Sequence, residues 1–507
     1  MIGRITGEGV SKLTFRTYYS EKVDLGEVLV VEDEDDSSRL FIRVVDILYG
    51  SDAHDDGWME RTAGNILSME RTGEEYQLHD RDRRLYQLGV AVPLGYDRNG
   101  NIHKAKTLPA HLSPVSRPSE FDYQFLKSTA GDLKVGFFRS GERIIEIPVG
   151  IWGRDLPQHV GIFATTGMGK SNLMRVLSAS IMCSQKYGLL LMDPHGEYLR
   201  GPSPIEGGLQ DVDGHHDNLV VFSSHPKMGE SRLVLSSMEI EPADLAEVYN
   251  ISEPQMEFCL AVRDLFGNGW FMKINDSTTE EMENEFGKRY HISTISAVQR
   301  KVNALFSRDI VENRKEMVLA NSVIDALSRA KVVVVDTSYM DSREEMLVLS
   351  VLARRVFSHA KRMYSLDEEQ FQNMPPILIT VEEAQRVLGK DKGTVFSKIA
   401  REGRKFKVGL CAISQQPKLI NPEVISQFNT LFILGLSDKR DRDILKESAK
   451  QDISGLSKEI QTLGLGEGLV ASPGLPFAVP FKAHHFAAVY KDRKKNKKSA
   501  KLDEGFF

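Results

Sequence analysis

The 507-residue sequence predicts an α/β protein in which a parallel sheet with crossover helices follows a small β-barrel and is interrupted by a helical insertion. Short strand patterns fill the first part of the chain, apolar strands alternate with helical patterns from about residue 153, and strand patterns stop between 239 and 330. We therefore expect a barrel domain with its linker at 1–152, a sheet domain at 153–238 and 331–485, a helical insertion at 239–330 and a basic tail at 486–507.

The barrel is predicted from short β-type runs bounded by turn residues. They lie at 27–31, 40–47 and 88–94. A hairpin turn is expected at Asn99-Gly100. We interpret the acidic run at 32–36 as a solvated hairpin tip in preference to a metal site, and the proline- and serine-containing stretch 109–118 as a connection.

The sheet is predicted from runs of apolar residues that lack polar alternation, which indicates strands covered on both faces. These runs are 159–163, 188–192, 218–222, 331–335, 377–381, 409–413 and 430–434. In the insertion, Ser252 and Gln255 have the spacing of a helix capping box. Further on, Ile295, Val298, Val302 and Leu305 form one helical stripe.

A phosphate-binding loop lies between the first of these strands and an apolar helix pattern, over residues 164–171 (ATTGMGKS). Its glycines let backbone N–H groups converge on phosphates, Lys170 adds a positive charge, and the Ser171 hydroxyl is placed to hold Mg²⁺. Ala164 replaces the usual first glycine, so it must adopt an ordinary backbone conformation. We assign nucleotide binding to Thr166, Gly167, Met168, Gly169, Lys170, Ser171 and Asn172.

A second strand end supplies the carboxylates that nucleotide hydrolysis needs. Glu382 and Glu383 follow the strand at 377–381 and point differently, so we assign Glu382 to the metal and Glu383 to the attacking water; the alternative is an ordinary helix start. Asp193 also ends a strand and is a second metal candidate. Asp336 is a rival for the metal, but no acid follows it, and we interpret His195 as an orienting turn residue.

Two further segments carry candidate catalytic residues. Gln415 follows the strand at 409–413 and is placed to sense the terminal phosphate. Arg401 and Arg404 are candidates for an arginine that a neighbouring subunit contributes to the transition state. The alternative is the solvated face of a helix.

Composition limits the class of protein. With 65 basic and 71 acidic residues the net charge is −6, so no global positive field attracts nucleic acid and any DNA contact is local. Lys390, Lys392, Lys405 and Lys407 are candidates for it, and the basic tail is either a phosphate contact or a solvated tail. The three cysteines fit no metal or disulfide spacing, and no apolar run approaches a membrane span, so we expect a soluble cytoplasmic protein.

Together these residues resemble the HerA family of hexameric DNA-translocating ATPases, which are relatives of the FtsK motor proteins. The resemblance covers nearly the whole chain, and it depends on the order and spacing of the motifs. Besides the barrel they are residues 165–172, 193–198, 382–384, 402–405 and 414–417. Ala164, Gln385 and Gln416 depart from the family, which often has glycine, histidine and arginine at these places.

The resemblance implies a RecA-like P-loop ATPase domain, a barrel of the HAS-barrel type, and ATP with Mg²⁺ as cofactors. It further implies a homo-hexameric ring on double-stranded DNA, working with a NurA-type nuclease in DNA end processing or with another effector enzyme in antiviral defence. Two other functions stay open. One is a nucleotide-stabilised ring scaffold that regulates an effector enzyme, and the other is a protein-secretion-type ATPase, against which the lack of a membrane segment argues.

Overall fold

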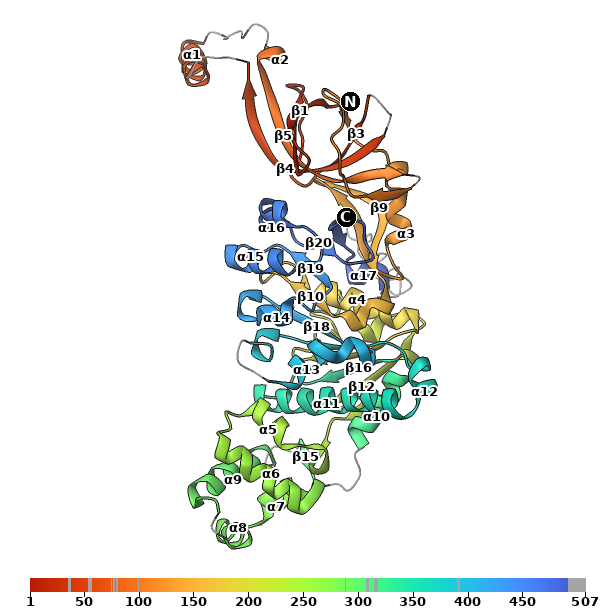
Figure 1. Ribbon diagram of the computed structural model, residues 1–507, viewed down its shortest axis with the longest axis vertical. Coiled ribbons are helices and arrows are strands. Elements are labelled where there is room, and N and C mark those ends of the chain that lie inside the picture. Colours follow the sequence, from red (N-terminus) through yellow and green to blue (C-terminus); the bar gives the residue numbers. More distant parts are fainter. Residues whose placement is uncertain are drawn as a thin grey trace, which may run out of the picture.

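The computed structural model describes residues 1–34, 38–52, 57–73, 75, 78, 81–98, 100–287, 289–306, 310–313, 318–389 and 393–490. The molecule is elongated, with the barrel at one end, the helical insertion at the other and the large sheet between them (Figure 1). The predicted α/β class, with a barrel and an insertion, is therefore confirmed.

The barrel is closed by a pairing between β2 and β5 in the order β2-β1-β7-β3-β4-β5, and β6 extends β5. Its strands are β1 Gly3–Gly9, β2 Lys12–Thr17, β3 Val28–Glu32, β4 Arg39–Ser51, β5 Leu85–Arg98, β6 Asn101–His103 and β7 Pro114–Ser116. The expected connection at 109–118 thus contains β7, which lies between β1 and β3. A three-residue strand is too short to show a sequence period, so β7 is recognised only from its pairing with β1 and β3.

The acidic run was expected at a hairpin tip, and β3 and β4 do pair up to Glu32 and Arg39. Glu34 forms an ion pair with Arg4, whereas residues 35–37 lie outside the described residues, as does Asn99 of the predicted turn. Glu34 therefore neutralises the charge of Arg4 on β1.

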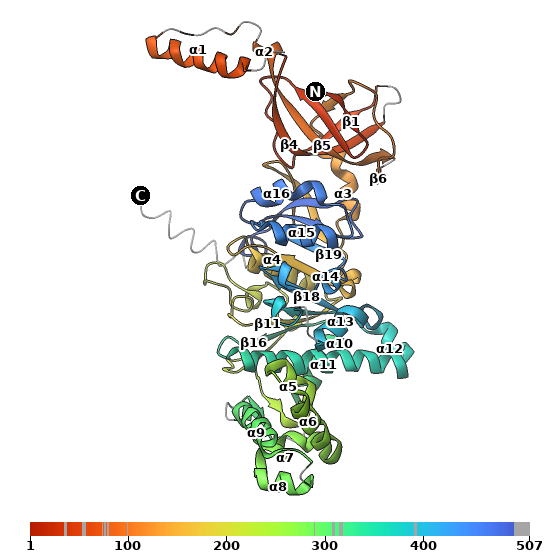
Figure 2. The same cartoon turned by 60° about the vertical axis from the view of Figure 1, so that its left-hand side comes forward.

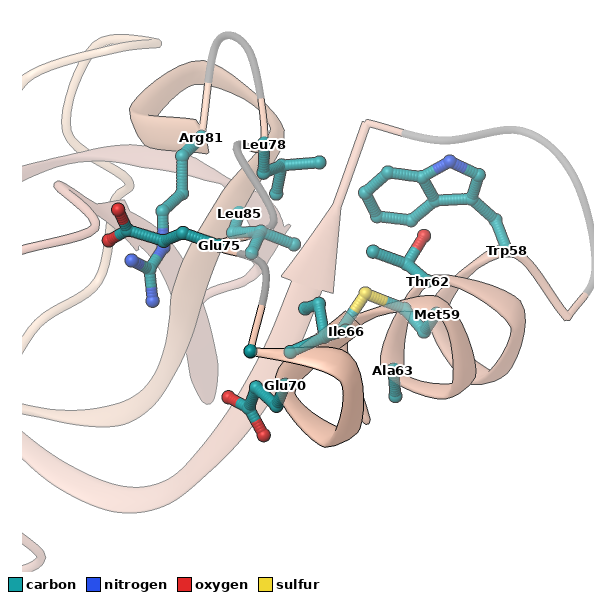
Figure 3. A pocket seen from close by; sticks show the side chains of 11 residues that line it. Trp58, Met59, Thr62, Ala63, Ile66, Glu70, Glu75, Leu78, Arg81 and Leu85 are labelled. Atoms are coloured by element: carbon teal, nitrogen blue, oxygen red, sulfur yellow. The ribbon is translucent and has the colours of Figure 1, made fainter. Parts of the chain in front are cut away.

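The strands β4 and β5 continue beyond the barrel as an arm, which carries α1 (Trp58–Thr72) and α2 (Arg81–Arg84) at its end (Figure 2). Most of α1 is exposed, and Trp58, Met59 and Ile66 face a hollow of about 480 Å³ together with Leu85 (Figure 3). Helix α1 was not predicted from the sequence.

The large sheet has the order β13-β12-β16-β11-β17-β18-β10-β19-β20-β21-β8-β9 among the described residues. The pairs from β13 to β19 are parallel, and those from β19 to β9 are antiparallel. The strands are β8 Leu133–Ser140, β9 Arg143–Ile151, β10 Val160–Phe163, β11 Gly188–Asp193, β12 Leu219–Ser223, β13 Ser231–Arg232, β16 Val332–Asp336, β17 Ile377–Val381, β18 Val408–Ser414, β19 Thr430–Leu434, β20 Glu467–Ala471 and β21 Val479–Ala483. Every strand predicted for this sheet is present.

Helices cover both faces of the sheet, as the apolar strands predicted. In β11, Leu189 and Leu191 pack into one core with α4, while Leu190 and Met192 pack into the other with α11. The helices around the sheet are α3 Gln124–Thr129, α4 Lys170–Ser184, α11 Ser342–Leu366, α12 Glu368–Asn373, α13 Val395–Glu402, α14 Pro422–Ile425, α15 Lys439–Ser448, α16 Ser457–Thr462 and α17 Phe486–Tyr490. Within the described ranges, no helix is long and apolar enough to cross a membrane.

Two segments lie elsewhere than the sequence predicted. The hairpin β8–β9 was counted with the barrel domain, but β8 pairs with β21 and so belongs to the large sheet. Residues 486–490 were counted with the basic tail, but they form α17, where Phe486 is fully buried; residues 491–507 lie outside the described residues. The residue pattern of a segment does not reveal which distant strand or helix it contacts, because strand pairing depends on packing against residues that are far away in the sequence.

In the described part of the chain the predicted insertion contains six helices. Those within residues 253–306 pack with one another and bury Trp270 and Phe271, whereas the helix at 318–328 packs against β11, β16 and α11 of the sheet domain. The helices are α5 Pro242–Val248, α6 Glu253–Phe266, α7 Trp270–Asp276, α8 Thr279–Glu285, α9 Ile292–Phe306 and α10 Val318–Ser328. Two short strands also pair here, β14 (Leu235–Ser236) and β15 (Val311–Glu312). The predicted stripe on α9 is buried, and the backbone N–H of Ser252 donates to Gln255 at 3.4 Å, as the capping box predicted.

A buried charge cluster joins the barrel to the sheet domain. Glu459 on α16 accepts hydrogen bonds from Arg43 on β4 and Arg139 on β8, each at 2.6 Å. All three side chains are at most 5% exposed. Because an unpaired buried charge is costly, this cluster holds the two domains in one arrangement.

Candidate active site

The phosphate-binding loop connects β10 to α4 as predicted. Gly167 and Gly169 have φ of 81° and 96°, which L side chains rarely adopt, and α4 begins at Lys170. Ala164 is fully buried and does not have a positive φ. Its backbone conformation therefore does not require the glycine that is usual at this position. The loop therefore presents backbone N–H groups and the start of a helix to an anion.

A pocket of about 560 Å³ surrounds this loop. Its lining includes Lys170, Ser171, Glu382, Glu383 and Gln415. They meet because the strands β10, β18 and β17 are parallel neighbours, so the carboxyl ends of all three lie at one edge of the sheet. The volume is within the range of small-molecule sites, which run from roughly 300 to 1,000 Å³.

Glu382 lies on the side of the pocket next to Tyr198, whose phenol donates a hydrogen bond to Glu382 Oε1. Burial, followed by the negative charge of Glu383, raises the pKa of Glu382 to about 8. Burial likewise lowers the pKa of Lys170, although Glu382 and Glu383 oppose that shift. A divalent cation near Glu382 would favour the charged carboxylate, so this acid is suited to a metal-side role.

The donor set fits Mg²⁺ bound together with a nucleotide. Within the described residues no three His, Cys, Asp or Glu side chains are grouped as a metal cage. Ser171 and Glu382 instead offer one hydroxyl and one carboxylate beside the phosphate loop. Mg²⁺ in nucleotide sites commonly takes few protein ligands and completes its shell with phosphates and water.

Glu383 is held by two amide groups. Gln385 Nε2 donates to its Oε2 at 2.5 Å, and Gln415 Nε2 donates to its Oε1 at 3.3 Å. Thr166, on the phosphate loop, donates to the other end of the Gln415 amide. Glu383 has φ 46° and ψ 48°, a left-handed conformation that is uncommon for a residue with a side chain and occurs often at functional sites.

The two aspartates at strand ends differ in their surroundings. Asp193 lines the pocket but is fully buried, and its Oδ2 accepts the backbone N–H of Leu199 at 2.9 Å. Burial raises the pKa of Asp193 to about 7. Asp336 is not among the pocket-lining residues and forms an ion pair with Arg200 at 2.7 Å. These contacts favour Glu382 over Asp336 as the metal-side acid.

Several predicted site residues have other contacts. The side chain of Met168 is not among those that line the pocket and packs against the core beside Gly435. Asn172 lines the pocket, but its amide donates to the carbonyl of His484 at 2.7 Å and accepts the N–H of Phe486 at 3.0 Å. We therefore expect Met168 to contribute only its backbone, and Asn172 to hold the C-terminal segment against α4.

The two candidate arginines lie away from the phosphate loop of their own chain. Arg401 and Arg404 are exposed and line a separate hollow. Arg401 lies 3.6 Å from Glu423 in an exposed ion pair. The chain by itself does not bring either arginine to Glu383.

The candidate DNA-contacting lysines also differ. Lys407 donates to the carbonyls of Phe371, Gln372 and Met374, so it closes the end of α12. Lys405 is exposed, and its ammonium lies 4.7 Å from the ring centre of Tyr364. Lys390 and Lys392 lie outside the described residues.

Part of the pocket wall was not predicted from the sequence. Tyr198 stands in a quoted motif but was given no role, and Gln385 was noted only as a departure. A further part of the lining comes from residues around β20 and β21, namely Leu465, Gly466, Lys482, Ala483 and His485. No local pattern marks these residues, since they reach the pocket only through the strand order.

The loop, the acid pair and the parallel sheet define a P-loop nucleoside triphosphatase. Residues 133–356 match the family described as Helicase HerA, central domain. The part of the chain that holds the phosphate loop is therefore similar to a HerA central domain, and the resemblance to the HerA family that the sequence predicted is confirmed.

Curated relatives extend this similarity over most of the chain. A probable helicase of Methanocaldococcus jannaschii is 26% identical over 97% of this chain and 92% of its own length. The DNA double-strand break repair helicase HerA of Saccharolobus solfataricus is 25% identical over 74% of this chain and 73% of its own length.

The chain is also similar to solved structures, at lower sequence identity. The bacterial conjugative coupling protein TrwB has 13% identity and a TM-score of 0.48, over 71% of this chain and 91% of its own. VirB4 of Thermoanaerobacter pseudethanolicus has 14% identity and a TM-score of 0.42, over 70% of this chain and 96% of its own.

Proposed function

We propose that this protein hydrolyses ATP with Mg²⁺ to move along double-stranded DNA. The observation that carries the proposal is the convergence of Lys170 and Ser171 from the phosphate loop with Glu382 and Glu383 in one pocket. Hydrolysis requires a phosphate-binding cation, a metal-side acid and a residue that orients water, and these four side chains supply all three. The helicase names of the relatives support DNA as the substrate.

In this mechanism Lys170 and the backbone of the loop bind the β- and γ-phosphates. Mg²⁺, when bound, would neutralise phosphate charge beside Ser171 and Glu382. Glu383 orients the attacking water. Gln415 holds Glu383 in a fixed position relative to the phosphate loop, because it forms hydrogen bonds with both Glu383 and Thr166. Asp193 closes the turn behind Glu382 through its bond to Leu199 and so acts as support.

The assembly that best accommodates these residues is a ring of identical subunits, for which we propose six. Arg401 and Arg404 are exposed and remote from the pocket, which suits residues that complete a neighbour's site. Contact with duplex DNA is then local to the ring's inner surface, since the whole chain has a net charge of −6. A NurA-type nuclease or another effector enzyme is the proposed partner, in DNA end processing or antiviral defence.

The test compares ATP hydrolysis by the wild-type protein and by Lys170→Ala and Glu383→Gln variants, with and without duplex DNA. We expect both variants to lose hydrolysis, and duplex to stimulate the wild type less as salt rises, because phosphate contacts release counterions. Unchanged turnover in Glu383→Gln would contradict the assigned chemistry. Hydrolysis without any duplex response, in rings that still bind an effector, would instead support a scaffold.

A further inference from the structure

Gln385 lies two residues after Glu383, in the short turn Ala384–Arg386 that follows the acid pair. Its amide N–H donates to Glu383 Oε2 at 2.5 Å. Its amide oxygen accepts the hydroxyl of Ser414, the last residue of β18, at 2.6 Å. Gln385 therefore bridges the strand end that carries Glu383 to the neighbouring strand end.

The orientation of this amide is set by its partners. Ser414 Oγ accepts the backbone N–H of Gln416 at 3.0 Å, so its proton points to Gln385. An ionised carboxylate only accepts hydrogen bonds, so the NH₂ group must face Glu383. The donors therefore all run one way, from Gln416 through Ser414 and Gln385 to Glu383, and such chains strengthen one another.

The second carboxylate oxygen of Glu383 accepts a hydrogen bond from Gln415. Gln415 is tied to the phosphate loop through Thr166, whereas Gln385 is tied to Ser414, which is 1% exposed. One amide thus connects Glu383 to the phosphate loop, and the other connects it to the buried end of β18.

We infer that Gln385 is a positioning residue, which fixes the carboxylate of Glu383 for the attacking water through the bridge to Ser414. The inference rests on the proposed role of Glu383 in ATP hydrolysis. Because an orienting group acts on the chemical step, its loss lowers kcat with little effect on nucleotide binding. Glu383 also has a left-handed backbone, so its side-chain direction depends on such bonds.

The experiment measures kcat and KM for ATP, and the dissociation constant for ADP, in Gln385→Leu, Gln385→His, Ser414→Ala and the Gln385→Leu/Ser414→Ala double variant. Leucine keeps the size of the side chain without hydrogen bonds, and neutral histidine has one donor and one acceptor nitrogen. Gln372→Leu is the matched control, because this glutamine is exposed on α12, away from the pocket.

We expect Gln385→Leu to lower kcat roughly 10- to 100-fold with KM and ADP affinity changed less than about twofold. Gln385→His should restore part of kcat. Ser414→Ala should cost less than Gln385→Leu and add almost nothing in the double variant, because both act through one bridge.

A kcat for Gln385→Leu within about twofold of the wild type would overturn the inference, as would fully additive losses in the double variant. A decrease in kcat accompanied by comparable losses of ADP affinity and thermal stability would also overturn the inference, because a residue with a merely structural role would give that result. If Glu383→Gln itself retains hydrolysis, the proposed function fails instead, whatever Gln385 does.

Discussion

Tyr198 donates a hydrogen bond from its phenol to a carboxylate oxygen of Glu382. The two residues are 184 positions apart in the sequence. They meet because β11, which precedes Tyr198, and β17, which precedes Glu382, are adjacent parallel strands. Tyr198 is only 4% exposed, so the bond is shielded from water and directs the metal-side acid.

Replacing Tyr198 with phenylalanine should raise the Mg²⁺ concentration needed for half-maximal ATPase activity about fivefold, because one hydrogen bond is worth about 1 kcal/mol. The measurement is a Mg²⁺ titration at saturating ATP. Tyr187→Phe is the control, since its hydroxyl donates to Asp132 at 2.6 Å, and neither residue is among those that line the pocket. The same Mg²⁺ requirement in Tyr198→Phe and wild type would contradict the role.

The arginine that completes the site should act between subunits. Arg404→Ala and Glu383→Gln proteins are each expected to be inactive, yet a mixture assembled in equal parts should regain activity. About a quarter of the subunit interfaces then pair an intact Glu383 with an intact Arg404. ATPase rate against mixing ratio is the measurement, and Arg401→Ala in the same mixture tests the other arginine. No recovery at any ratio, for either arginine, argues against a shared site.

Acid should destabilise the protein through His159. Burial lowers the pKa of this residue to about 4, and its Nδ1 accepts the backbone N–H of Leu410 at 3.0 Å, so the folded state holds it neutral. As pH falls from about 6.5 to 4 the unfolded chain gains a proton that the folded chain does not, which removes roughly 3 kcal/mol of stability.

Thermal unfolding of the wild type and of His159→Asn between pH 7 and pH 4 measures this effect. Asparagine offers an acceptor oxygen without titrating in this range, so the variant should lose less stability on acidification. The exposed His111 provides the matched control as His111→Asn. Parallel acid dependence in His159→Asn and the wild type would refute the assignment.

The cluster of Arg43, Arg139 and Glu459 should dominate the stability of the barrel junction. Changing Glu459→Gln leaves two buried guanidinium groups without a counter-charge, which we expect to cost about 3–5 kcal/mol. Chemical denaturation and limited proteolysis between the domains measure the change. Lys458→Gln is the control, because Lys458 joins the same helix α16 to Asp46 of β4 but is 63% exposed. Such a surface pair is worth at most about 1 kcal/mol, so equal losses in both variants would contradict this account.

The sequence alone determined the local elements and the chemistry they carry. Apolar runs predicted the strands β10, β11, β12, β16, β17, β18 and β19, and residues 164–171 identified the phosphate loop. These features depend only on residues that are close in the chain. Strand and helix periods repeat within a few residues, and the wide conformational range of a glycine does not depend on distant residues. The acid pair was located for the same reason, since it directly follows an apolar strand.

Only the tertiary structure decided which of these residues meet. The placement of β8 and β9 at the edge of the large sheet and the position of β7 between β1 and β3 in the barrel follow from pairings between distant segments. The contacts that orient the acid pair, from Tyr198, Gln385 and Gln415, likewise depend on the order of β11, β17 and β18 in the sheet. Strand order is set by packing of the whole domain, and a hydrogen bond between residues far apart leaves no period in either segment.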